Sequence, residues 1–365
     1  MRDVDAIVVG GGVMGTSAAR WLAQRGRETL LLERFEIGNA LGSSAGQTRI
    51  FRLAHPDPED VRMARVALEL WRELEDEAQE TLLHPTGGLF AGPIAREWAL
   101  ALEAAGERSE LIAAGEVAER WPAIAFGPGT DVLWQAEGGV LMAERAVRAQ
   151  ARLAVAAGAT VLEGAPAQRL VANGEGAEVR TPDEVFRAPV VVIAAGPWAG
   201  RLLSQAGLEL PLSPVLTQVT YFEQVEPSPW PTIIDRSVAS PANAYMVPDP
   251  EEPGAFKVGA DPSGPPVDPE ALPFEADASL VQETIAYAGE RLGVVRAGRS
   301  EASMLTQTPD QRFLLDRRGP VVIASPCSGH GFKFAPLIGR VVADLAMTRA
   351  TPIPIERFLA ARFRS

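Results

Sequence analysis

Short, nearly continuous runs of apolar residues mark the start, the middle and the end of the chain. They lie at residues 5–10, 28–32, 190–195 and 321–324, and such runs are typical of parallel strands that are buried on both faces. Segments with apolar residues at helical spacing separate them. The pattern predicts helices at residues 58–79, 93–106, 115–121, 143–157 and 334–347, with a further helix that ends at Gln24.

The pattern changes between residues 212 and 265, where apolar and polar residues alternate and prolines interrupt the chain. Alternation of this kind predicts an antiparallel sheet with one face toward solvent or a ligand. Residues 248–272 are rich in Pro, Asp and Glu and predict long loops. The fold class that follows is α/β, with an inserted part that is built on an antiparallel sheet.

The first apolar run leads into glycines with the spacing G-x-G-x-x-G, at Gly10, Gly12 and Gly15. In a dinucleotide fold the first glycine makes a tight turn, the second lets the backbone approach a pyrophosphate, and the third permits close helix packing. Glu33 ends the next predicted strand. An acid there accepts hydrogen bonds from a ribose and disfavours a 2′-phosphate. We therefore expect a dinucleotide at this end of the chain.

The composition excludes several classes of protein. A chain of 365 residues suffices for about two domains. The formal net charge of -13 lacks the basic footprint of a nucleic-acid-binding protein, and no basic amphipathic segment indicates a membrane surface. One cysteine and three scattered histidines offer neither a disulfide nor a metal site. Because no signal peptide precedes the first strand, we expect a cytoplasmic protein.

Only two of the 34 basic residues are lysines, Lys257 and Lys333. Arginine replaces lysine nearly everywhere else, so these two positions are candidates for sites that need a compact, titratable ammonium. Lys257 alternates with Phe256 and Val258 and so lies on the opposite face of the predicted strand. A lysine on an edge strand, present for solubility, is the competing interpretation.

Residues 42–46 match the nucleophile elbow G-x-S-x-G of serine hydrolases. Ser44, Asp310 and His330 even follow one another in the order that these hydrolases use. The elbow requires a preceding β-branched strand, which residues 36–41 do not provide. A serine hydrolase is therefore the weaker hypothesis, and a nucleotide-binding regulatory protein is the non-enzymatic one.

Two arginines follow that motif closely, Arg49 and Arg52. If their segment is helical, they lie one turn apart and share a face. Ordinary surface arginines have the same spacing, so the spacing alone leaves their role open.

The motifs together resemble those of the D-amino-acid-oxidase-like FAD-dependent oxidoreductases, and most closely those of monomeric sarcosine oxidase and N-methyltryptophan oxidase. The likeness extends over nearly the whole chain and rests on residues 7–15, 46–52, 194–198, 256–259 and 328–334. The resemblance implies a Rossmann-like FAD-binding domain that is assembled from residues 1–80, 140–212 and 309–365. It also implies a substrate domain of residues 81–139 and 213–308, whose antiparallel sheet covers the flavin.

The resemblance also implies roles for single residues. Arg49 lies beside the flavin ring and Lys257 over it, where a localised positive charge favours the reaction with oxygen. Arg52 and Lys333 hold the substrate carboxylate, and Tyr245 lines the pocket. The implied cofactor contacts are Gly10, Gly12, Val13, Met14, Gly15, Glu33, Arg34, Ser43, Thr48, Arg49, Ala167, Gly196, Trp198, Met304, Gly329, Gly331, Phe332 and Lys333.

The sequence departs from this family at three positions. Ser303 stands where the relatives attach FAD through a cysteine, and a serine hydroxyl is too weak a nucleophile for that bond, so we predict noncovalent FAD. Leu305 replaces a pocket tyrosine, and Asp261 replaces a pocket histidine. Asp261 either binds a second cationic group of a larger amine or faces solvent. A pocket changed in this way predicts a substrate other than sarcosine.

We therefore expect an FAD-dependent oxidase of a secondary or N-alkylated amino acid. In such an enzyme hydride passes to flavin N5, the imine hydrolyses, and oxygen becomes hydrogen peroxide. The runner-up is a dehydrogenase of the same fold with another electron acceptor. We expect a monomer, a structural role for His330, and a small buried side chain at Cys327, without chemistry.

Overall fold

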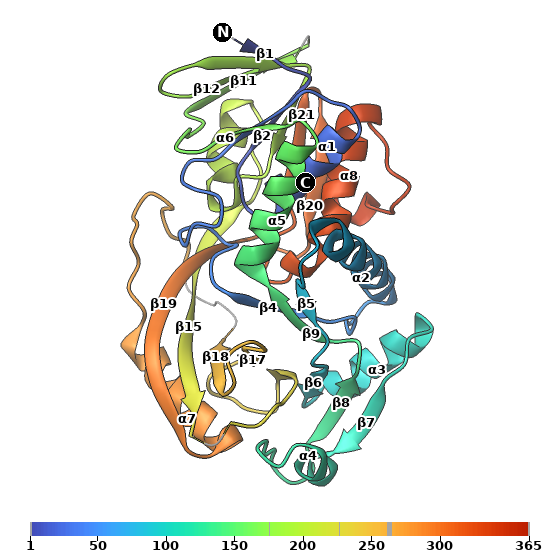
Figure 1. The fold of residues 1–365 in the computed structure, drawn as a ribbon, viewed down its shortest axis with the longest axis vertical. Helices are drawn as coiled ribbons and strands as arrows, with labels where there is room; N and C mark the ends of the chain where they lie inside the picture. Colours follow the sequence, from blue (N-terminus) through green and yellow to red (C-terminus); the bar gives the residue numbers. More distant parts are fainter. Residues whose placement is uncertain (1, 175, 226, 261–264, 364–365) are drawn as a thin grey trace.

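A six-stranded sheet forms the centre of one lobe, at the top of Figure 1. The computed structural model describes residues 2–174, 176–225, 227–260 and 265–363. The strands pair in parallel except for the last, and all four apolar runs of the sequence lie within the sheet. In spatial order they are β10 (Thr160–Leu162), β3 (Thr29–Leu32), β2 (Ala6–Val9), β14 (Val190–Ile193), β21 (Val321–Ser325) and β20 (Leu314–Arg318).

Helices cover one face of this sheet. The helix α1 (Val13–Gln24) follows the glycine motif and packs between α5 (Ala143–Ala156) and α8 (Ala335–Thr348), with α2 (Pro58–Ala78) outside them. Val8 of β2, Leu22 of α1 and Val341 of α8 belong to the same buried core. These helices begin and end within two residues of the bounds that the hydrophobic pattern predicts.

A small sheet covers the opposite face. Its strands are β1 (Arg2–Asp3), β13 (Val185–Ala188), β12 (Gly176–Arg180) and β11 (Arg169–Asn173), and the helix α6 (Ala199–Gln205) packs beside it. Ile7, Val191 and Phe186 meet in the core between the two sheets. The lobe is thus a helix layer, a mostly parallel sheet and a second sheet. The α/β class that the pattern predicts is confirmed, with a small sheet in place of helices on one face.

An eight-stranded sheet forms the second lobe, at the bottom of Figure 1. All its neighbours pair antiparallel except β16 with β6. One face packs against α7 (Ala278–Leu292), and the helices α3 (Ile94–Ala104) and α4 (Ala114–Arg120) lie near its end. The order is β19 (Val295–Gln307), β15 (Ser213–Gln224), β18 (Ala255–Gly259), β17 (Ala244–Pro248), β16 (Thr232–Asp235), β6 (Gly88–Ala91), β8 (Asp131–Gln135) and β7 (Glu110–Ala113).

A three-stranded sheet lies where the lobes meet and consists of β4 (Thr48–Phe51), β9 (Gly139–Met142) and β5 (Leu83–His84). Its first strand carries Arg49, whose register partner on β9 is Leu141. The helical geometry considered for Arg49 and Arg52 is therefore wrong. Pairing with β9, which is distant in the sequence, holds this segment extended.

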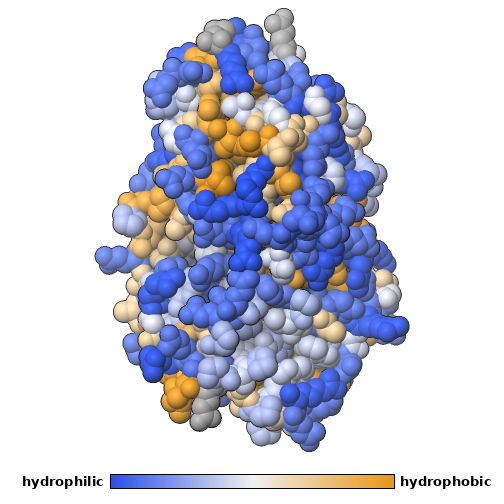
Figure 2. All heavy atoms as spheres, in the orientation of Figure 1, coloured by the Kyte–Doolittle hydropathy of each residue, from blue (hydrophilic) through white to orange (hydrophobic). Residues whose placement is uncertain are grey.

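On the side shown in Figure 2 most residues at the surface are hydrophilic, and the hydrophobic residues gather mainly in the upper half. Among the helices of the described chain, none combines the length and the apolar character that crossing a bilayer requires.

Candidate active site

A cavity of about 1840 Å³ lies between the two lobes. Its walls come from the carboxyl ends of β2, β3 and β14 on one side and from β15, β17, β18 and β19 on the other. Ligands of open α/β sheets bind outside the carboxyl ends of the strands. Pockets for small molecules usually hold about 300–1,000 Å³, so this cavity has room for a large cofactor together with a substrate.

The glycine motif forms one end of the cavity, where the backbone is too tightly packed for side chains. Gly10 has a φ of +106°, and a Cβ on it would lie 2.4 Å from the carbonyl oxygen of Ala194. A Cβ on Gly15 would lie 1.7 Å from Gly10 O, so the contact between α1 and the turn requires glycine there. Gly12 is the N-cap residue of α1. The backbone N–H groups of a helix start favour a phosphate group at this position.

Glu33 lies at the end of β3 and is buried beside this turn. Its carboxylate accepts hydrogen bonds from Gly11 N at 2.5 Å and from Phe35 N at 2.8 Å. Burial raises the pKa of Glu33 above its ordinary value, and these backbone donors oppose the rise. The acid that the sequence places at a ribose therefore lines the cavity next to the glycine turn.

Arg34 closes the same end of the cavity. It forms two hydrogen bonds to Glu270, of 2.7 and 2.6 Å, which hold the pKa of that carboxyl below its usual range. The guanidinium also lies 5.3 Å from the ring centroid of Trp198 and 5.2 Å from that of Phe35. This clasp joins the nucleotide end of the cavity to the segment between β18 and α7.

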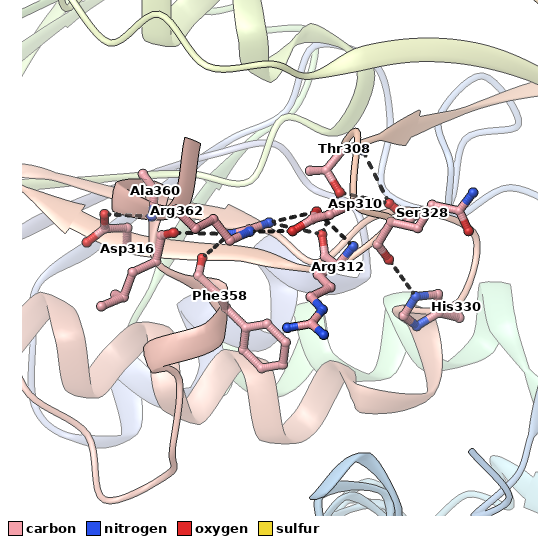
Figure 3. Close-up of polar contacts among 11 residues, drawn as sticks. Thr308, Asp310, Arg312, Asp316, Ser328, His330, Phe358, Ala360 and Arg362 are labelled. Carbon is pink, nitrogen blue, oxygen red and sulfur yellow. Dashed lines mark hydrogen bonds and ion pairs between the residues drawn. The ribbon is translucent and has the colours of Figure 1, made fainter. Parts of the chain in front are cut away.

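Ser44 has a structural contact at the start of α1, where its hydroxyl accepts a hydrogen bond from Val13 N at 3.0 Å. Asp310 accepts a hydrogen bond from Arg362 Nε at 2.7 Å (Figure 3), and His330 Nε2 lies 3.1 Å from Gln311 O. In the described part of the chain Ser44, Asp310 and His330 therefore form no hydrogen-bonded triad. The serine-hydrolase hypothesis lacks the geometry that it requires.

Three polar side chains converge around Gly46, in the middle of the cavity wall. A Cβ on Gly46 would lie 3.5 Å from Arg49 Nη1, 3.6 Å from Tyr221 Oη and 4.0 Å from Lys257 Nζ. Thr48 O accepts hydrogen bonds from Lys257 Nζ at 2.6 Å and from Arg49 Nη1 at 2.9 Å. Two cations thus share one backbone acceptor at the cavity surface.

The interpretation of Lys257 as an edge-strand lysine is wrong. Its strand, β18, lies between β15 and β17, and the residue is 4% exposed. Phe256 and Val258 point into the core under α7, as their alternation predicts, and Lys257 points into the cavity. Burial lowers the pKa of the Lys257 ammonium well below the ordinary value, and the charge of Arg49 lowers it further.

Arg52 and Lys333 form a second group of cations. Lys333 Nζ donates to His330 O at 2.6 Å, and Arg52 donates to Ala54 O while its guanidinium lies 4.5 Å from the ring centroid of Trp98. Burial and the neighbouring Arg52 hold the pKa of Lys333 well below its usual range. Two adjacent buried cations form a strong site for a carboxylate.

Tyr245, on β17, and Leu305, on β19, lie in the opposing wall. A Cβ on Gly259 would lie 2.3 Å from the hydroxyl of Tyr245, and one on Gly329 would lie 3.7 Å from Leu305 Cδ2. Gly259 therefore leaves the space that the Tyr245 ring fills, whereas a Cβ on Gly329 would make only an ordinary contact with Leu305.

The remaining predicted residues fall into three sets. Gly15 contacts the turn rather than the cavity. Asp261 lies outside the described residues. The others line the cavity, namely Val13, Met14, Ser43, Thr48, Ala167, Gly196, Ser303, Met304, Gly331 and Phe332.

His330 and Cys327 both line the cavity and are partly exposed, so Cys327 is less buried than the sequence predicts. Burial, with the charge of Lys333 beside it, lowers the pKa of His330 to about 3, so the ring is neutral near pH 7. Burial raises the pKa of Cys327 to about 11, and its thiol lies 2.8 Å from the hydroxyl of Ser325. Neither side chain is ionised at neutral pH.

Sequence reasoning missed Tyr221, which is the register partner of Lys257 across β15 and β18. Its hydroxyl donates to Glu301 at 3.0 Å, and burial with that carboxylate raises the pKa of Tyr221 to about 12. Tyr221 alternates along β15 with Thr217 and Val219, and all three line the cavity. The spacing is visible in the sequence, but the face that meets the cavity is not. In the described chain no cluster of three or more His, Cys, Asp or Glu side chains has the arrangement of a metal site.

The glycine turn at one end of the cavity suits a dinucleotide, and the buried cations suit a small acid. Together these features are typical of a class of cofactor-dependent enzymes that act on small acids. The family model described as FAD dependent oxidoreductase matches residues 5–345. Peroxisomal sarcosine oxidase of Mus musculus is 33% identical over 377 residues, which cover 98% of this chain and 96% of that protein. Monomeric sarcosine oxidase of an Arthrobacter species is 32% identical over 379 residues, with coverages of 98% and 96%.

Solved structures extend the comparison. NikD, described as an unusual amino acid oxidase essential for nikkomycin biosynthesis, is 27% identical, covers 99% of this chain and 98% of its own, and has a TM-score of 0.89. L-proline dehydrogenase from P. horikoshii shares the fold, with a TM-score of 0.88 at 23% identity and coverages of 99% and 98%. The chain belongs to the family of FAD-dependent oxidoreductases and is an FAD-dependent enzyme that acts on amino acids.

Proposed function

We propose that the protein is an oxidase of secondary or N-alkylated amino acids that uses molecular oxygen. The observation that carries this proposal is that two buried cations, Arg52 and Lys333, line the same cavity as the glycine cradle and lie close enough for Arg52 to lower the pKa of Lys333. A carboxylate held by these two cations would place the adjacent amine toward the middle of the cavity, near Lys257. The names of the similar sarcosine oxidases and of N-methyl-L-tryptophan oxidase from Yersinia pestis support the same class of substrate.

The residues fit FAD because the cavity offers a backbone cradle without side chains at Gly10 and Gly12, and an acid at Glu33. Bound FAD supplies the two-electron oxidation of the carbon next to the nitrogen, and oxygen takes up the electrons as hydrogen peroxide while the imine product hydrolyses in water. The side chains of the protein would orient the substrate and supply positive charge in the cavity.

Lys257 and Arg49 would supply positive charge in the middle of the cavity. They are fixed in place by their hydrogen bonds to Thr48 O, so that no reorganisation is needed when negative charge develops beside them. Burial of Lys257 strengthens its interaction with any anion nearby, because little water screens it. We infer that this charge assists the reduction of oxygen.

The wall of the pocket would select the substrate. Tyr245 presents a ring and a hydroxyl, and Leu305 presents an aliphatic surface. Because Leu305 offers no polar group, we infer that the substrate is larger and less polar at this point than sarcosine. Asp261 lies outside the described residues, and its part in selection stays a prediction.

We also propose that FAD is bound without a covalent bond. Ser303 lies on β19 and lines the cavity, and its hydroxyl is a poor nucleophile at neutral pH. Precipitation with acid should release the yellow colour into the supernatant. Colour that stays in the washed pellet would contradict the proposal.

A peroxide-coupled screen of the purified FAD-bound enzyme tests the function. N-methyl amino acids, cyclic imino acids and sarcosine are offered in air, with the corresponding primary amino acids as controls. We expect peroxide from one or more secondary amines, with sarcosine a poor substrate. Electron transfer to an added quinone without peroxide would identify a dehydrogenase instead, and no reaction with any secondary amine would reject the proposed class. The monomeric state and the cytoplasmic location stay predictions.

A further inference from the structure

The side chains of Tyr221 and Lys257 lie next to each other on one face of the eight-stranded sheet. The two residues are register partners across β15 and β18, and partners in an antiparallel pair point to the same face with their Cβ atoms close together. A Cβ on Gly46 would lie 3.6 Å from Tyr221 Oη and 4.0 Å from Lys257 Nζ. The distance between the hydroxyl and the ammonium is therefore no larger than the sum of these two distances.

Tyr221 lies at a β-bulge. The pairing of β15 with β19 shifts its register between Thr220 and Phe222. Bulges re-aim a side chain and are common beside active sites. Here the Tyr221 hydroxyl turns toward β19 and donates to Glu301 Oε2 at 3.0 Å. The Tyr221 hydroxyl thus lies near Lys257 on one side and contacts a carboxylate of the next strand on the other.

Glu301 is held by two donors, one on each oxygen of its carboxylate. Oε2 accepts from Tyr221, and Oε1 accepts from Arg299 Nε at 2.7 Å. The Arg299 guanidinium also lies 4.2 Å from the ring centroid of Tyr221. The Glu301 side chain is 45% exposed, whereas Lys257 is buried, and both line the cavity. The two hydrogen bonds therefore fix a charged carboxylate at a set distance from a buried ammonium.

The charge of Lys257 depends on the groups around it. Burial lowers the pKa of Lys257 most, the cation of Arg49 lowers it further, and the carboxylates of Glu301 and Asp249 raise it, with the larger effect from Glu301. The ionisable side chains on the strands around Lys257 and directly beyond them are Arg49, Tyr221, Tyr245, Asp249, Arg299 and Glu301. Without a nearby carboxylate, burial and Arg49 would both favour the neutral amine.

We propose that Glu301, held in place by Tyr221, is a positioning residue that keeps Lys257 charged during the reaction with oxygen. This inference rests on the proposed function, in which the Lys257 ammonium assists the reduction of oxygen. Glu301 acts through the electric field, so it needs no contact with the cofactor or with oxygen. Tyr221 adds no charge of its own, because burial and the Glu301 carboxylate raise its pKa to about 12.

The rarity of lysine makes the charge of Lys257 directly measurable. Protein labelled with an NMR-active isotope at the lysine ε-carbon has only two labelled side chains, those of Lys257 and Lys333. The variant Lys257→Met identifies which resonance is which. In the oxidised, FAD-bound protein we expect Glu301→Gln to lower the titration midpoint of Lys257 by about 0.5–1 pH unit, because one nearby negative charge is lost. Lys333 should titrate as before.

Two variants separate the charge of Glu301 from its position. Glu301→Asp keeps the charge and should retain most of the midpoint of Lys257. Tyr221→Phe keeps the ring and removes the hydrogen bond, so that the carboxylate can turn toward water. We expect a lowered midpoint that is closer to the original than that of Glu301→Gln.

Two controls remove a carboxylate elsewhere. Glu223 pairs with Arg296 at 2.9 Å across the same two strands, and both side chains are exposed. Glu223→Gln should therefore leave the midpoint of Lys257 unchanged. Asp60 raises the pKa of Lys333, so Asp60→Asn should lower the midpoint of Lys333 and leave that of Lys257 where it is.

The pH profile of reoxidation by oxygen tests the consequence for the reaction. Well below both midpoints Glu301→Gln should react as fast as the unmodified enzyme, because Lys257 is charged in both. As pH rises through the lowered midpoint, the variant should become slower by up to about three- to tenfold. Slowing by the same factor at every pH would overturn the assignment, since a damaged fold has that effect.

An unchanged midpoint of Lys257 in Glu301→Gln, or an equal shift in Glu223→Gln, would also overturn the assignment. Reduced enzyme that is reoxidised only by an added quinone would instead reject the proposed function. The lysine titration still decides the role of Glu301 in that case, because it needs neither substrate nor oxygen.

Discussion

Lys257 is one of two lysines in a chain that otherwise uses arginine, and it is buried where Arg49 and Tyr221 converge. Replacing Lys257→Met removes the ammonium and keeps most of the volume. We expect reoxidation of the reduced enzyme by oxygen to slow by about 10²–10³-fold, as is typical for loss of a preorganised charge. Stopped-flow absorbance measures this step.

Reduction of the same variant by substrate without oxygen is the control. It should change much less, because Arg52 and Lys333 still bind the carboxylate. If both steps slow equally, or if neither does, Lys257 has no specific role in the oxygen reaction.

The pH dependence gives a second prediction at this residue. Burial places the pKa of Lys257 well below 10.5, so the positive charge is present below the lowered pKa and lost as pH rises through it. The rate of reoxidation should fall with rising pH, with a midpoint below 10.5 that is absent in Lys257→Met.

The lowered pKa of Lys257 also affects how the free energy of unfolding depends on pH. An unfolded chain keeps the lysine proton up to about pH 10.4. The unfolded state therefore binds more protons between the lowered pKa and that value, and Lys257 makes the free energy of unfolding rise with pH in this window. Denaturant titrations of the unmodified protein and the Met variant should diverge there, and parallel pH dependences would contradict the assignment.

At the scale of elements, the contact between α1 and the turn after β2 depends on Gly15. A Cβ there would meet Gly10 O at 1.7 Å, and a backbone atom cannot move aside as a flexible side chain can. We expect Gly15→Ala to lower the free energy of unfolding by about 3 kcal/mol and to yield protein with little bound FAD. Chemical denaturation and cofactor absorbance measure the two effects.

Gly289→Ala is the matched control. This glycine lies in α7, and a Cβ on it meets nothing within 4 Å. Stability should stay the same or rise by up to about 1 kcal/mol, because alanine is the better helix former. Equal losses in both variants would mean that the tight contact at Gly15 is not the cause.

Helices and strands with a strong hydrophobic pattern could be predicted from the sequence. The buried strands β2, β14 and β21 are continuous apolar runs, and α2 has a clear apolar face. The strand β19 was not predicted, because most of its side chains are at least partly exposed and its pairing with β15 defines it. The same holds for β4, where the predicted geometry was wrong because the partner strand β9 is distant in the sequence.

The residues of the candidate site also fall into those that the sequence reveals and those that only the fold reveals. Lys257 and Lys333 stand out because lysine is rare in this chain, and the glycine motif has a fixed spacing. Glu301 is one acid among many, and its place beside Tyr221 depends on the pairing of β15 with β19, which only the fold reveals.

At the scale of the whole molecule, the clasp between Arg34 and Glu270 joins the two sides of the nucleotide end of the cavity. Without a covalent bond at Ser303, such contacts would retain the cofactor. The pair is about one third exposed, so its contribution is modest. We expect Glu270→Gln to speed FAD dissociation by about two- to fivefold, as measured by the recovery of free FAD fluorescence.

The salt dependence of FAD dissociation tests the contact between Arg34 and Glu270 in a second way. High ionic strength should bring the rate of the unmodified protein toward that of Glu270→Gln, because exposed charges are screened. Glu290→Gln, an exposed charge change on α7, should leave the rate unchanged. Identical dissociation from all three proteins at low salt would show that the clasp does not retain FAD.

The central claim is that one cavity oxidises an N-alkylated amino acid and passes the electrons to oxygen. The most direct measurement mixes the FAD-bound enzyme with an N-methyl amino acid in the absence of oxygen, and then adds oxygen. The account predicts that the yellow absorbance bleaches in the first step and returns in the second, with one peroxide for each cofactor. Absorbance that does not bleach, or that returns only with an added quinone, would contradict it.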